Sequence, residues 1–409
     1  VKCHQGRRAG RIQRHAVHAL QPALQGIGIV HALHLLLAQK GYPVFFETLQ
    51  WLIVDEWHEL LGSKRGVQIE LAVARLYQLA TEIAHAHQTK TRFQVWGISA
   101  TIGNLAEAKD VLLSPLNNAG IIVKAAIQKQ YRIQSVFPDE IEKYPWAGHL
   151  GIKLAHKVES IIRSHKSTLI FINTRGMSET WYQTLLDLFP DLAGTLALHH
   201  GSIDQPIRIW VEEALHAGKL QAVVCTASLD LGVDFRPVEA VIQVGSPKGV
   251  GRFLQRAGRS GHQPDAESNA WFLPTHTLEL LEASALKEGI STGIVESRQP
   301  HVLSFDVLIQ FLGTLAVSEG FEPTKVLPMI RSTHAYRHMS DDEWQSVLQF
   351  LTEGGKALHQ YDEYQKVQRD EQGIYRITSR KMAMRHRLQI GTIVSDAMIK
   401  VKLLNGGFI

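Results

Sequence analysis

The chain has 409 residues, little cysteine and no long apolar run. Its two cysteines, Cys3 and Cys225, are too few for a disulfide framework or a cysteine-based zinc site, and they fit a reducing cytoplasm. Because no apolar stretch is long enough to span a bilayer, we expect a soluble, cytoplasmic protein without a membrane partner. The formal net charge of +4 permits a polyanionic partner but does not require one.

Acidic residues are missing from the beginning of the chain, where the first is Glu47. A basic arm for nucleic acid, an arginine-rich transit peptide, or a shifted reading frame in a truncated gene would each explain this composition. Residues 1–46 contain no serine, and the chain starts at Val1. We therefore favour the third hypothesis and treat residues 1–32 as an atypical, frameshifted segment.

A phosphate-binding loop of the form G-x-x-x-x-G-K-[ST] is also absent from the 409 residues. Such a loop supplies the backbone amides and the lysine that hold nucleotide phosphates. We therefore expect that this chain alone hydrolyses no ATP, whatever other nucleotide-binding residues it carries.

The most informative stretch is Gln-Trp-Leu-Ile-Val-Asp-Glu-Trp-His at residues 50–58. Its apolar run predicts a strand buried in a parallel sheet, so that Asp55 and Glu56 emerge at the carboxyl end, where open α/β sheets bind ligands. An aspartate there can hold Mg²⁺ on a nucleotide, and the adjacent glutamate can orient or deprotonate a water molecule. Taken alone, a strand that ends in a polar turn explains the pattern equally well.

Strands and helices alternate in two series, which predicts two doubly wound parallel sheets. In the first series we expect a helix from Val67 to Ala84 and a strand over residues 93–98. In the second series the pattern predicts strands at 168–172, 196–199, 222–225 and 240–244, and helices at 178–189 and 206–216. A linker is expected near Pro145.

Two arginines lie three residues apart in Gln-Arg-Ala-Gly-Arg-Ser-Gly-His, residues 255–262. On one helical face, Arg256 and Arg259 can point at one anion, and a guanidinium suits phosphate because it forks and keeps its charge. We expect Arg259 to be the finger that stabilises a phosphoryl transition state, and Arg256 to serve as an internal prop or a nucleotide contact. The alternative is a basic, solvated helix end.

Other polar residues directly follow predicted strands, where hydroxyls and arginines can bind nucleic-acid phosphates. Thr174 and Arg175 follow one strand, and Thr226 follows another. The adjacent His199 and His200 have no cysteine or histidine partner at ligand spacing, so a metal site is rejected.

The order DEWH, SAT, FINTR, HHGS, TASLDLGVDF and QRAGRSGH resembles that of superfamily 2 helicases. The wording of residues 55–66, DEWHELLGSKRG, and of residues 255–262 resembles Lhr-type proteins, in particular the bacterial ligase-associated DEXH-box helicases. The resemblance covers residues 33–409. It implies two RecA-like doubly wound domains, the first incomplete, then a winged-helix domain and the start of a β-rich domain. The expected boundaries are 33–146, 147–296, 297–385 and 386–409.

The resemblance also implies roles for single residues. Glu56, Arg259 and His262 would be catalytic, although His262 stands where most of the superfamily has a second finger arginine. Asp55 and Glu56 would hold Mg²⁺, and ATP would contact Asp55, Gly232, Asp234 and Arg256. Ser99, Thr101 and His58 would couple the nucleotide to the strand. The implied nucleic-acid contacts are Lys64, Arg65, Thr174, Arg175, His200, Gly201 and Thr226.

The implied activity is that of an ATP-driven motor that moves 3′ to 5′ on single-stranded DNA and unwinds DNA or RNA–DNA duplexes in repair. A DNA ligase and a nuclease of the same repair system are the implied partners. One alternative is a catalytically inactive nucleic-acid-binding module derived from such a helicase. Another is a different P-loop NTPase with a protein substrate.

The tail carries its own signals. We expect an amphipathic helix from Phe305 to Val317 and a capping box at residues 340–343 that opens a second helix. Residues 364–367 and 373–378 suggest a wing hairpin. The basic residues that follow suit phosphates; they are Arg380, Lys381, Arg385 and Arg387.

Overall fold

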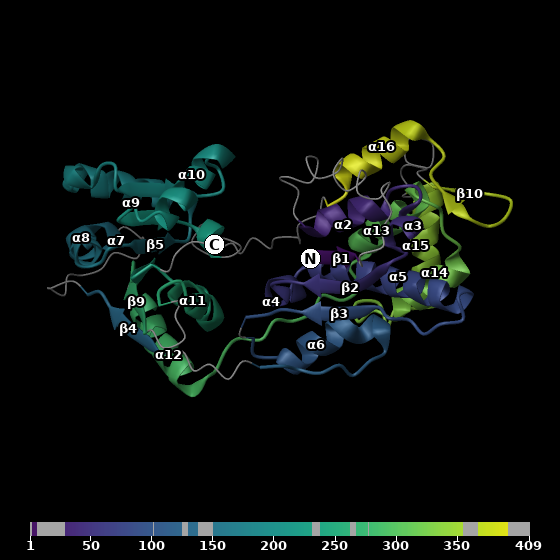
Figure 1. Ribbon diagram of the computed structural model, residues 1–409, viewed down its shortest axis with the longest axis horizontal. Coiled ribbons are helices and arrows are strands. Elements are labelled where there is room, and N and C mark those ends of the chain that lie inside the picture. Colours follow the sequence, from purple (N-terminus) through teal and green to yellow (C-terminus); the bar gives the residue numbers. More distant parts are fainter. Residues whose placement is uncertain are drawn as a thin grey trace, which may run out of the picture. The chain divides into compact units, whose positions relative to one another are not determined.

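A computed structural model describes most of the chain (Figure 1). For residues 2–5, 29 and 150 it describes only the backbone. The described residues are 2–5, 29–100, 102–124, 130–137, 150–230, 238–261, 267–276, 278–354 and 367–391. They belong to two compact units. Unit 1 comprises Val1–Ser99, Asn104–Ile122 and Arg298–Ile409, and unit 2 comprises Ala100–Gly103 and Val123–Ser297. None of the described helices has both the length and the apolar character that crossing a membrane requires.

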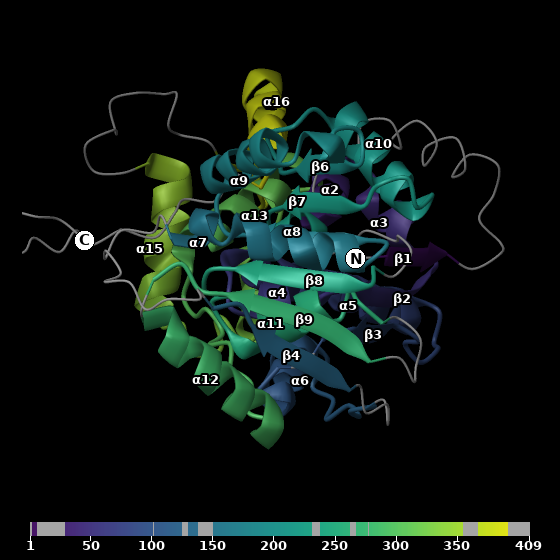
Figure 2. The same cartoon turned by 90° about the vertical axis from the view of Figure 1, so that its left-hand side faces the viewer.

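Unit 2 is built on a six-stranded sheet in the order β4-β9-β8-β5-β7-β6, and every neighbouring pair is parallel. Figure 2 shows strands β8, β9 and β4 side by side. The four strands predicted for the second series are all present, which confirms its doubly wound fold. The strands are β4 (Tyr131–Ser135), β5 (Thr168–Ile172), β6 (Leu196–His199), β7 (Ala222–Cys225), β8 (Ala240–Val244) and β9 (Ser268–Leu273).

Helices cover both faces of this sheet. Successive residues of its central strands point to opposite faces, and all of them are buried. In β5, Ile170 belongs to the apolar cluster around Trp181, whereas Phe171 belongs to the cluster around Val211 on the opposite face. The helices of unit 2 are α7 (Leu150–Lys153), α8 (Ala155–Ser164), α9 (Arg175–Leu188), η2 (Pro190–Leu192), α10 (Gln205–His216), η3 (Ala227–Leu229), α11 (Val250–Ala257) and α12 (Leu278–Thr292).

Strand β4 corrects one predicted boundary. It pairs with β9 along its whole length, so it belongs to the second sheet, and unit 2 resumes at Val123 rather than after residue 146. The pattern could not show this, because β4 has only five residues, is mostly half-buried, and pairs with a strand far along the chain. The predicted linker near Pro145 lies outside the described residues.

Unit 1 contains a three-stranded sheet of β1 (Lys2–Gln5), β2 (Leu49–Val54) and β3 (Gln94–Gly97). Strand β2 pairs with β1 antiparallel and with β3 parallel, and both β2 and β3 fall where the sequence predicts strands. The helices are α2 (Ile29–Leu37), α3 (Tyr42–Phe46), α4 (Trp57–Leu61), α5 (Lys64–Ala86), α6 (Leu105–Leu113), η1 (Ser114–Leu116), α13 (Phe305–Val317), α14 (Pro323–Arg331), α15 (Asp341–Glu353) and α16 (Arg380–Gln389).

Helix α5 lies at the centre of unit 1 and carries buried polar residues as well as apolar ones. The Gln68 side-chain amide donates to Oε1 of Gln310, at 2.9 Å. The Glu70 carboxyl group accepts a hydrogen bond of 2.9 Å from the backbone N–H of Ala335. Both partners lie after residue 297, so these bonds join the first α/β segment to the tail within one unit.

The tail adopts the predicted winged-helix fold. Helices α13, α14 and α15 are followed by a hairpin of β10 (Gln368–Arg369) and β11 (Tyr375–Arg376), and Phe321 bridges to Tyr375. Helix α13 has the predicted bounds. The predicted capping box is also present, because Ser340 and Glu343 bond reciprocally at the start of α15. Of the predicted wing residues, 364–366 lie outside the described residues.

Gly66 allows α4 and α5 to meet closely, and this gives a first prediction. A Cβ atom at residue 66 would lie 2.3 Å from the Leu60 carbonyl oxygen. We expect Gly66→Ala to lower the free energy of unfolding by about 1–3 kcal/mol, as overpacking does. Gly176→Ala in α9 is the matched control, because a Cβ there meets nothing within 4 Å. Denaturant unfolding of both variants checks this, and equal stability would contradict the steric argument.

Candidate nucleotide and nucleic-acid sites

The two carboxylates predicted to hold a nucleotide-bound metal directly follow β2 in unit 1. Asp55 is exposed and Glu56 is half-buried, and the Glu56 N–H donates to Asp55 Oδ1 at 3.0 Å. Glu56 has a left-handed backbone, with φ 53° and ψ 40°. Such a conformation is uncommon outside glycine, and strained residues of this kind cluster at functional sites. The turn therefore presents adjacent carboxylates at the carboxyl edge of the sheet.

Backbone hydrogen bonds tie this turn to the end of β3. The Ile98 N–H donates to the Val54 carbonyl at 2.8 Å, and the Trp57 N–H donates to the Ile98 carbonyl at 2.9 Å. Ser99 is the next residue, so the structure brings it beside the carboxylate turn, as its predicted coupling role requires. Its predicted companion Thr101 lies outside the described residues.

His58 is buried behind the carboxylates. Its Nδ1 atom lies 3.5 Å from Glu56 Oε2, and its Nε2 atom lies 3.7 Å from Glu59 Oε1. Burial lowers the pKa of His58 more than the nearby Glu59 raises it. The imidazole is therefore mainly neutral at pH 7 and lies beside the Glu56 carboxylate, and its coupling role stays a prediction.

Unit 1 contains two basic residues that are predicted to contact nucleic acid, Lys64 and Arg65, and their surroundings differ. The Lys64 ammonium forms an ion pair with Asp306 of α13, at 3.1 Å, and is largely buried. This contact attaches the winged helix to α5, and a phosphate contact by Lys64, which stays a prediction, would have to compete with Asp306. Arg65 is exposed and remains a candidate.

Asp55 and Glu56 fit a magnesium ion that arrives with a nucleotide. Among the described residues, no group of three or more histidine, cysteine, aspartate or glutamate side chains could hold a metal ion. Mg²⁺ commonly needs only one or two protein carboxylates, because water and substrate phosphates complete its octahedral shell. The carboxylate pair therefore suits Mg²⁺–ATP better than a resident metal.

In unit 2, the predicted nucleic-acid contacts gather at the carboxyl edge of three neighbouring strands. Thr174 and Arg175 follow β5, Thr226 follows β7, and Gly201 follows β6. Arg175 Nη1 donates to Ser202 Oγ at 2.5 Å, and its Nη2 atom would lie 3.7 Å from a Cβ on Gly201. The fold thus joins groups that are 27 residues apart in sequence into one surface.

Two of these residues have structural contacts. The Thr174 hydroxyl accepts from the Met177 N–H and caps α9. His200 is buried: Nδ1 accepts from the Ser202 N–H, and Nε2 lies 3.1 Å from a Glu179 carboxylate oxygen. The His200 ring therefore shapes the loop that presents Gly201, and its contact with nucleic acid stays a prediction.

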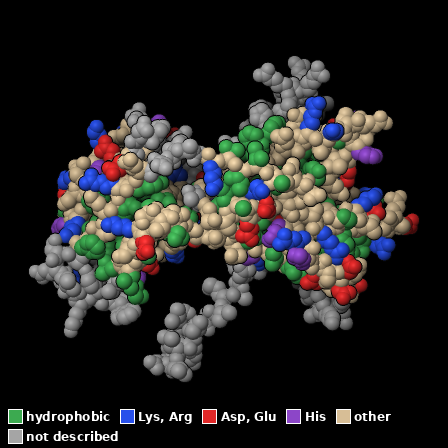
Figure 3. All heavy atoms as spheres, turned by 90° about the horizontal axis from the view of Figure 1, so that it is seen from below, with side chains coloured by type: hydrophobic (Ala, Val, Ile, Leu, Met, Phe, Trp, Pro, Cys, Tyr) green, Lys and Arg blue, Asp and Glu red, His purple; other side chains and the backbone are tan. Residues whose placement is uncertain are grey.

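Basic residues do not form one broad surface on the face drawn in Figure 3, where Lys and Arg side chains are interspersed with Asp and Glu. Phosphate contacts on such a surface depend on individual, well-positioned cations. Arg175 is positioned in this way, because its guanidinium is held by Ser202.

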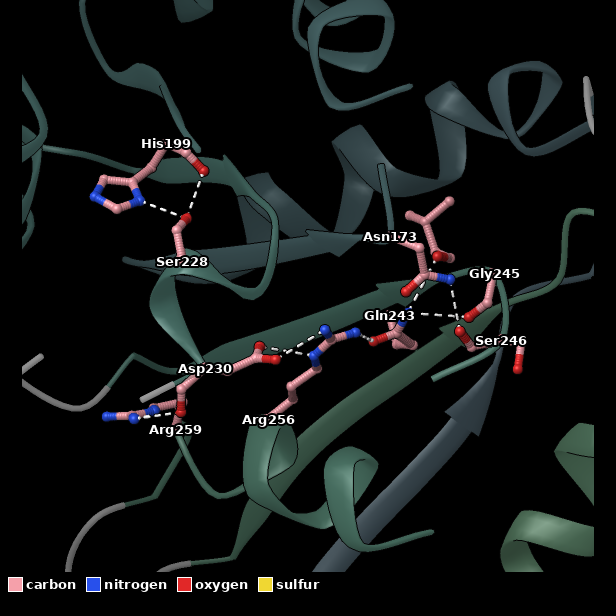
Figure 4. A network of polar contacts seen from close by, with 10 residues as sticks. Asn173, His199, Ser228, Asp230, Gln243, Gly245, Ser246, Arg256 and Arg259 are labelled. Atoms are coloured by element: carbon pink, nitrogen blue, oxygen red, sulfur yellow. Dashed lines mark hydrogen bonds and ion pairs between the residues drawn. The ribbon is translucent and has the colours of Figure 1, made fainter. Parts of the chain in front are cut away.

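Arg256 is the centre of a buried network in unit 2 (Figure 4). Its guanidinium makes a bidentate pair with Asp230, at 2.8 and 2.9 Å, and donates to Gln243 Oε1 at 2.7 Å. It also lies over the Phe171 ring, 4.9 Å from the centroid. Only 2% of the side chain is exposed, so these contacts favour the internal prop over direct contact with a nucleotide.

Arg259 differs from Arg256 in two respects. It is half-buried, and it contacts the backbone carbonyl of Asp230 rather than its carboxylate. Its Nη2 atom donates to the Asp230 carbonyl at 2.6 Å. This bond holds the arginine near the segment that carries the other predicted nucleotide contacts. Of the predicted residues, Gly232, Asp234 and His262 lie outside the described residues.

The sequence interpretation missed two polar residues of this network. Gln243 interrupts the apolar strand β8 and bonds both Arg256 and the Gly245 carbonyl, and Asn173 bonds the Ser246 carbonyl nearby (Figure 4). The lone glutamine in Ala-Val-Ile-Gln-Val was a usable signal, because a polar residue in a buried strand needs a partner.

A second missed group surrounds His199. Its Nδ1 atom lies 2.7 Å from Ser228 Oγ, and its Nε2 atom lies 3.1 Å from Glu212 Oε1. The Ser228 hydroxyl donates to the His199 carbonyl at 2.9 Å, so it is fixed within the protein. These bonds join the end of β6 to α10 and to η3, the turn that follows β7.

The fold and the strand-end residues define an α/β protein of the helicase type with a winged helix. Residues 153–263 match the helicase conserved C-terminal domain, and residues 288–409 match the winged-helix domain of large helicase-related proteins. The chain belongs to the Lhr-type helicase family.

Relatives in this family are named ATP-dependent helicases. The chain is 30% identical over 377 residues to Lhr-Core protein 2 of Thermococcus barophilus, covering 90% of the chain and 42% of the relative. It is 32% identical over 374 residues to Lhr-Core of Sulfolobus acidocaldarius, covering 90% and 41%. The chain thus spans about two-fifths of the length of these curated relatives.

A solved structure supports the fold. The Mycobacterium smegmatis helicase Lhr, bound to single-stranded DNA and AMP-PNP, matches with a TM-score of 0.78 at 24% identity. The match covers 96% of this chain and 49% of that protein.

Proposed function

We propose that the chain is part of an ATP-dependent helicase that moves 3′ to 5′ on single-stranded DNA and unwinds DNA or RNA–DNA duplexes in repair. The observation that carries this proposal is the grouping of Arg175, Gly201 and Thr226 at one carboxyl edge. Arginine and hydroxyl groups at this edge can bind backbone phosphates, and such contacts do not depend on the base sequence. A motor that moves along any sequence needs contacts of this kind. The named activities of the Lhr relatives and the DNA-bound Lhr structure support it.

ATP hydrolysis would supply the free energy for movement, with Mg²⁺ bound to the nucleotide. Asp55 would hold the metal, and Glu56 would orient a water molecule and accept its proton. Arg259 would stabilise the charge that develops on the transferred phosphoryl group. Arg256 and Asp230 would act indirectly, by fixing the segments that carry Arg259 and the residues after β7.

A DNA ligase and a nuclease of the same repair system are proposed as partners on the sequence resemblance alone. Co-purification of the native protein with a ligase from its own cells tests this part separately. Its failure would remove the partners and leave the motor proposal intact.

Nucleic-acid binding by the 409-residue chain is the direct test. We expect it to bind fluorescent oligo-dT in anisotropy titrations, more weakly as salt rises. Arg175→Ala should weaken binding roughly tenfold, as the loss of a charge-assisted hydrogen bond implies. Arg163→Ala is the matched control, because Arg163 lies in the last turn of α8, before β5, and is paired with Glu159 and Asp191. Equal losses for both variants would contradict the predicted site.

ATP turnover is tested separately by phosphate release with and without single-stranded DNA. For the chain as given we expect none, because its sequence holds no phosphate-binding loop. Clear DNA-stimulated turnover that Glu56→Gln abolishes would refute this expectation and strengthen the assignment of Glu56.

A further inference from the structure

The helix-turn-helix of the winged-helix domain has an acidic second helix. In such motifs the second helix normally enters the major groove of duplex DNA. Here that helix is α15, whose inner face packs through Trp344 and Leu348. Its charged residues are Asp341, Asp342, Glu343 and Glu353, and it contains no lysine or arginine. Phosphates would repel this helix, so groove binding through α15 is disfavoured.

The next helix, α16, has the opposite charge. It contains Arg380, Lys381, Arg385 and Arg387 and no acidic residue. One side is fixed to unit 1: His386 Nε2 lies 3.1 Å from Thr314 Oγ1, and Arg387 Nη2 donates to the Ala38 carbonyl at 3.0 Å. Figure 1 shows α16 along the outside of unit 1.

The opposite side of α16 is exposed and combines charge with apolar surface. Lys381, Met384, Arg385 and Leu388 follow the i, i+3, i+4, i+7 spacing of one helical stripe. Met384 is 64% exposed and Leu388 is 77% exposed. Within the described part of the chain, Lys381 and Arg385 have no acidic partner. We call these four residues the α16 stripe.

We propose that the α16 stripe binds single-stranded nucleic acid, and that the winged-helix domain uses this helix in place of α15. The two cations are complementary to backbone phosphates. The two apolar side chains can contact unstacked bases, which a single strand exposes and a duplex covers. The inference rests on the proposed function, because it assigns a further contact for the same strand.

The test compares variants of the 409-residue chain in salt titrations with fluorescent oligo-dT. Lys381→Glu with Arg385→Glu should weaken binding at least tenfold and reduce the salt slope by about 1.4, which is two phosphate contacts at about 0.7 each. Met384→Ser with Leu388→Ser should weaken binding several-fold while the salt slope stays unchanged, because only apolar contact is lost. Both pairs are exposed, so we expect the variants to fold, and circular dichroism checks this.

Two controls separate the outcomes. Lys90→Glu with Lys325→Glu makes the same change of net charge on exposed residues outside α16, and should have a much smaller effect. Asp342→Asn on α15 should leave affinity unchanged. If the α16 variant and its charge control lose affinity equally while Arg175→Ala still weakens binding, the α16 proposal fails and the proposed function stands. If the α16 variants lost affinity for a hairpin duplex but not for oligo-dT, the single-strand assignment would be wrong. If Asp342→Asn increased the affinity for nucleic acid, α15 would again be a candidate for the binding helix.

Discussion

Arg256→Ala is expected to lower the free energy of unfolding of unit 2 by about 3–5 kcal/mol, as the loss of one partner from a buried ion pair does. The substitution leaves the Asp230 carboxylate and the Gln243 amide oxygen without their guanidinium donors in the protein interior. It also removes the cation from the Phe171 ring. Denaturant unfolding, monitored by far-UV circular dichroism, measures the change.

Arg259→Ala is the matched control for this result. Arg259 belongs to the same sequence motif, but it is half-buried and its contact to Asp230 is made through the carbonyl oxygen. We expect a loss of about 1 kcal/mol or less, because a single hydrogen bond contributes about that much. If Arg259→Ala destabilised unit 2 more than Arg256→Ala, the assignment of prop and finger would be reversed.

Glu70→Gln is expected to stabilise unit 1 at alkaline pH. Burial raises the pKa of Glu70 from 4.5 to about 8, more than its backbone hydrogen bonds lower it. As pH rises from about 4.5 to 8, the carboxyl ionises in the unfolded chain but stays protonated in the folded one. Stability is therefore lost across this window, by an amount on the order of a few kcal/mol.

Glutamine keeps an oxygen acceptor for the Ala335 N–H but does not ionise. Melting temperatures measured between pH 5 and 9 should therefore fall less steeply for Glu70→Gln than for the parent chain, so that the difference between the two curves grows up to about pH 8 and is constant above it. Glu371→Gln in the exposed wing is the control, and should leave the pH profile unchanged. Parallel curves for the Glu70 variant and the parent chain would show that the buried carboxyl does not control this dependence.

Local patterns were sufficient for most of the sheet in unit 2. The four predicted strands are mainly apolar, and nearly all of their residues are buried, so that each sequence records its environment directly. Strand β4 gave no such signal, because none of its five residues is fully buried and its partner β9 is distant in sequence. The error in the predicted domain boundary follows from that weak local pattern.

A motif shows which predicted site residues lie at a strand end, but it does not show which side-chain contacts these residues make. The motif places Arg175 at a strand end, and the fold adds Ser202 as its neighbour. Spacing alone cannot show that Lys64 pairs with Asp306, because the partner is 242 residues away. Likewise, the inward orientation of His200 depends on Glu179 of another element. Sequence therefore located the strand ends at which ligands are predicted to bind, and the structure adds the long-range contacts that the side chains make there.

The discontinuity of unit 1 has a consequence for the order of events during protein synthesis. Helix α5 leaves the ribosome early, but the segments that cover Gln68 and Glu70 follow only after residue 297. Unit 2 is almost continuous, from Val123 to Ser297, and can form first although it lies in the middle of the chain. During that interval α5 exposes to solvent the surface that is buried in the folded unit, and exposed surface of this kind is prone to aggregation.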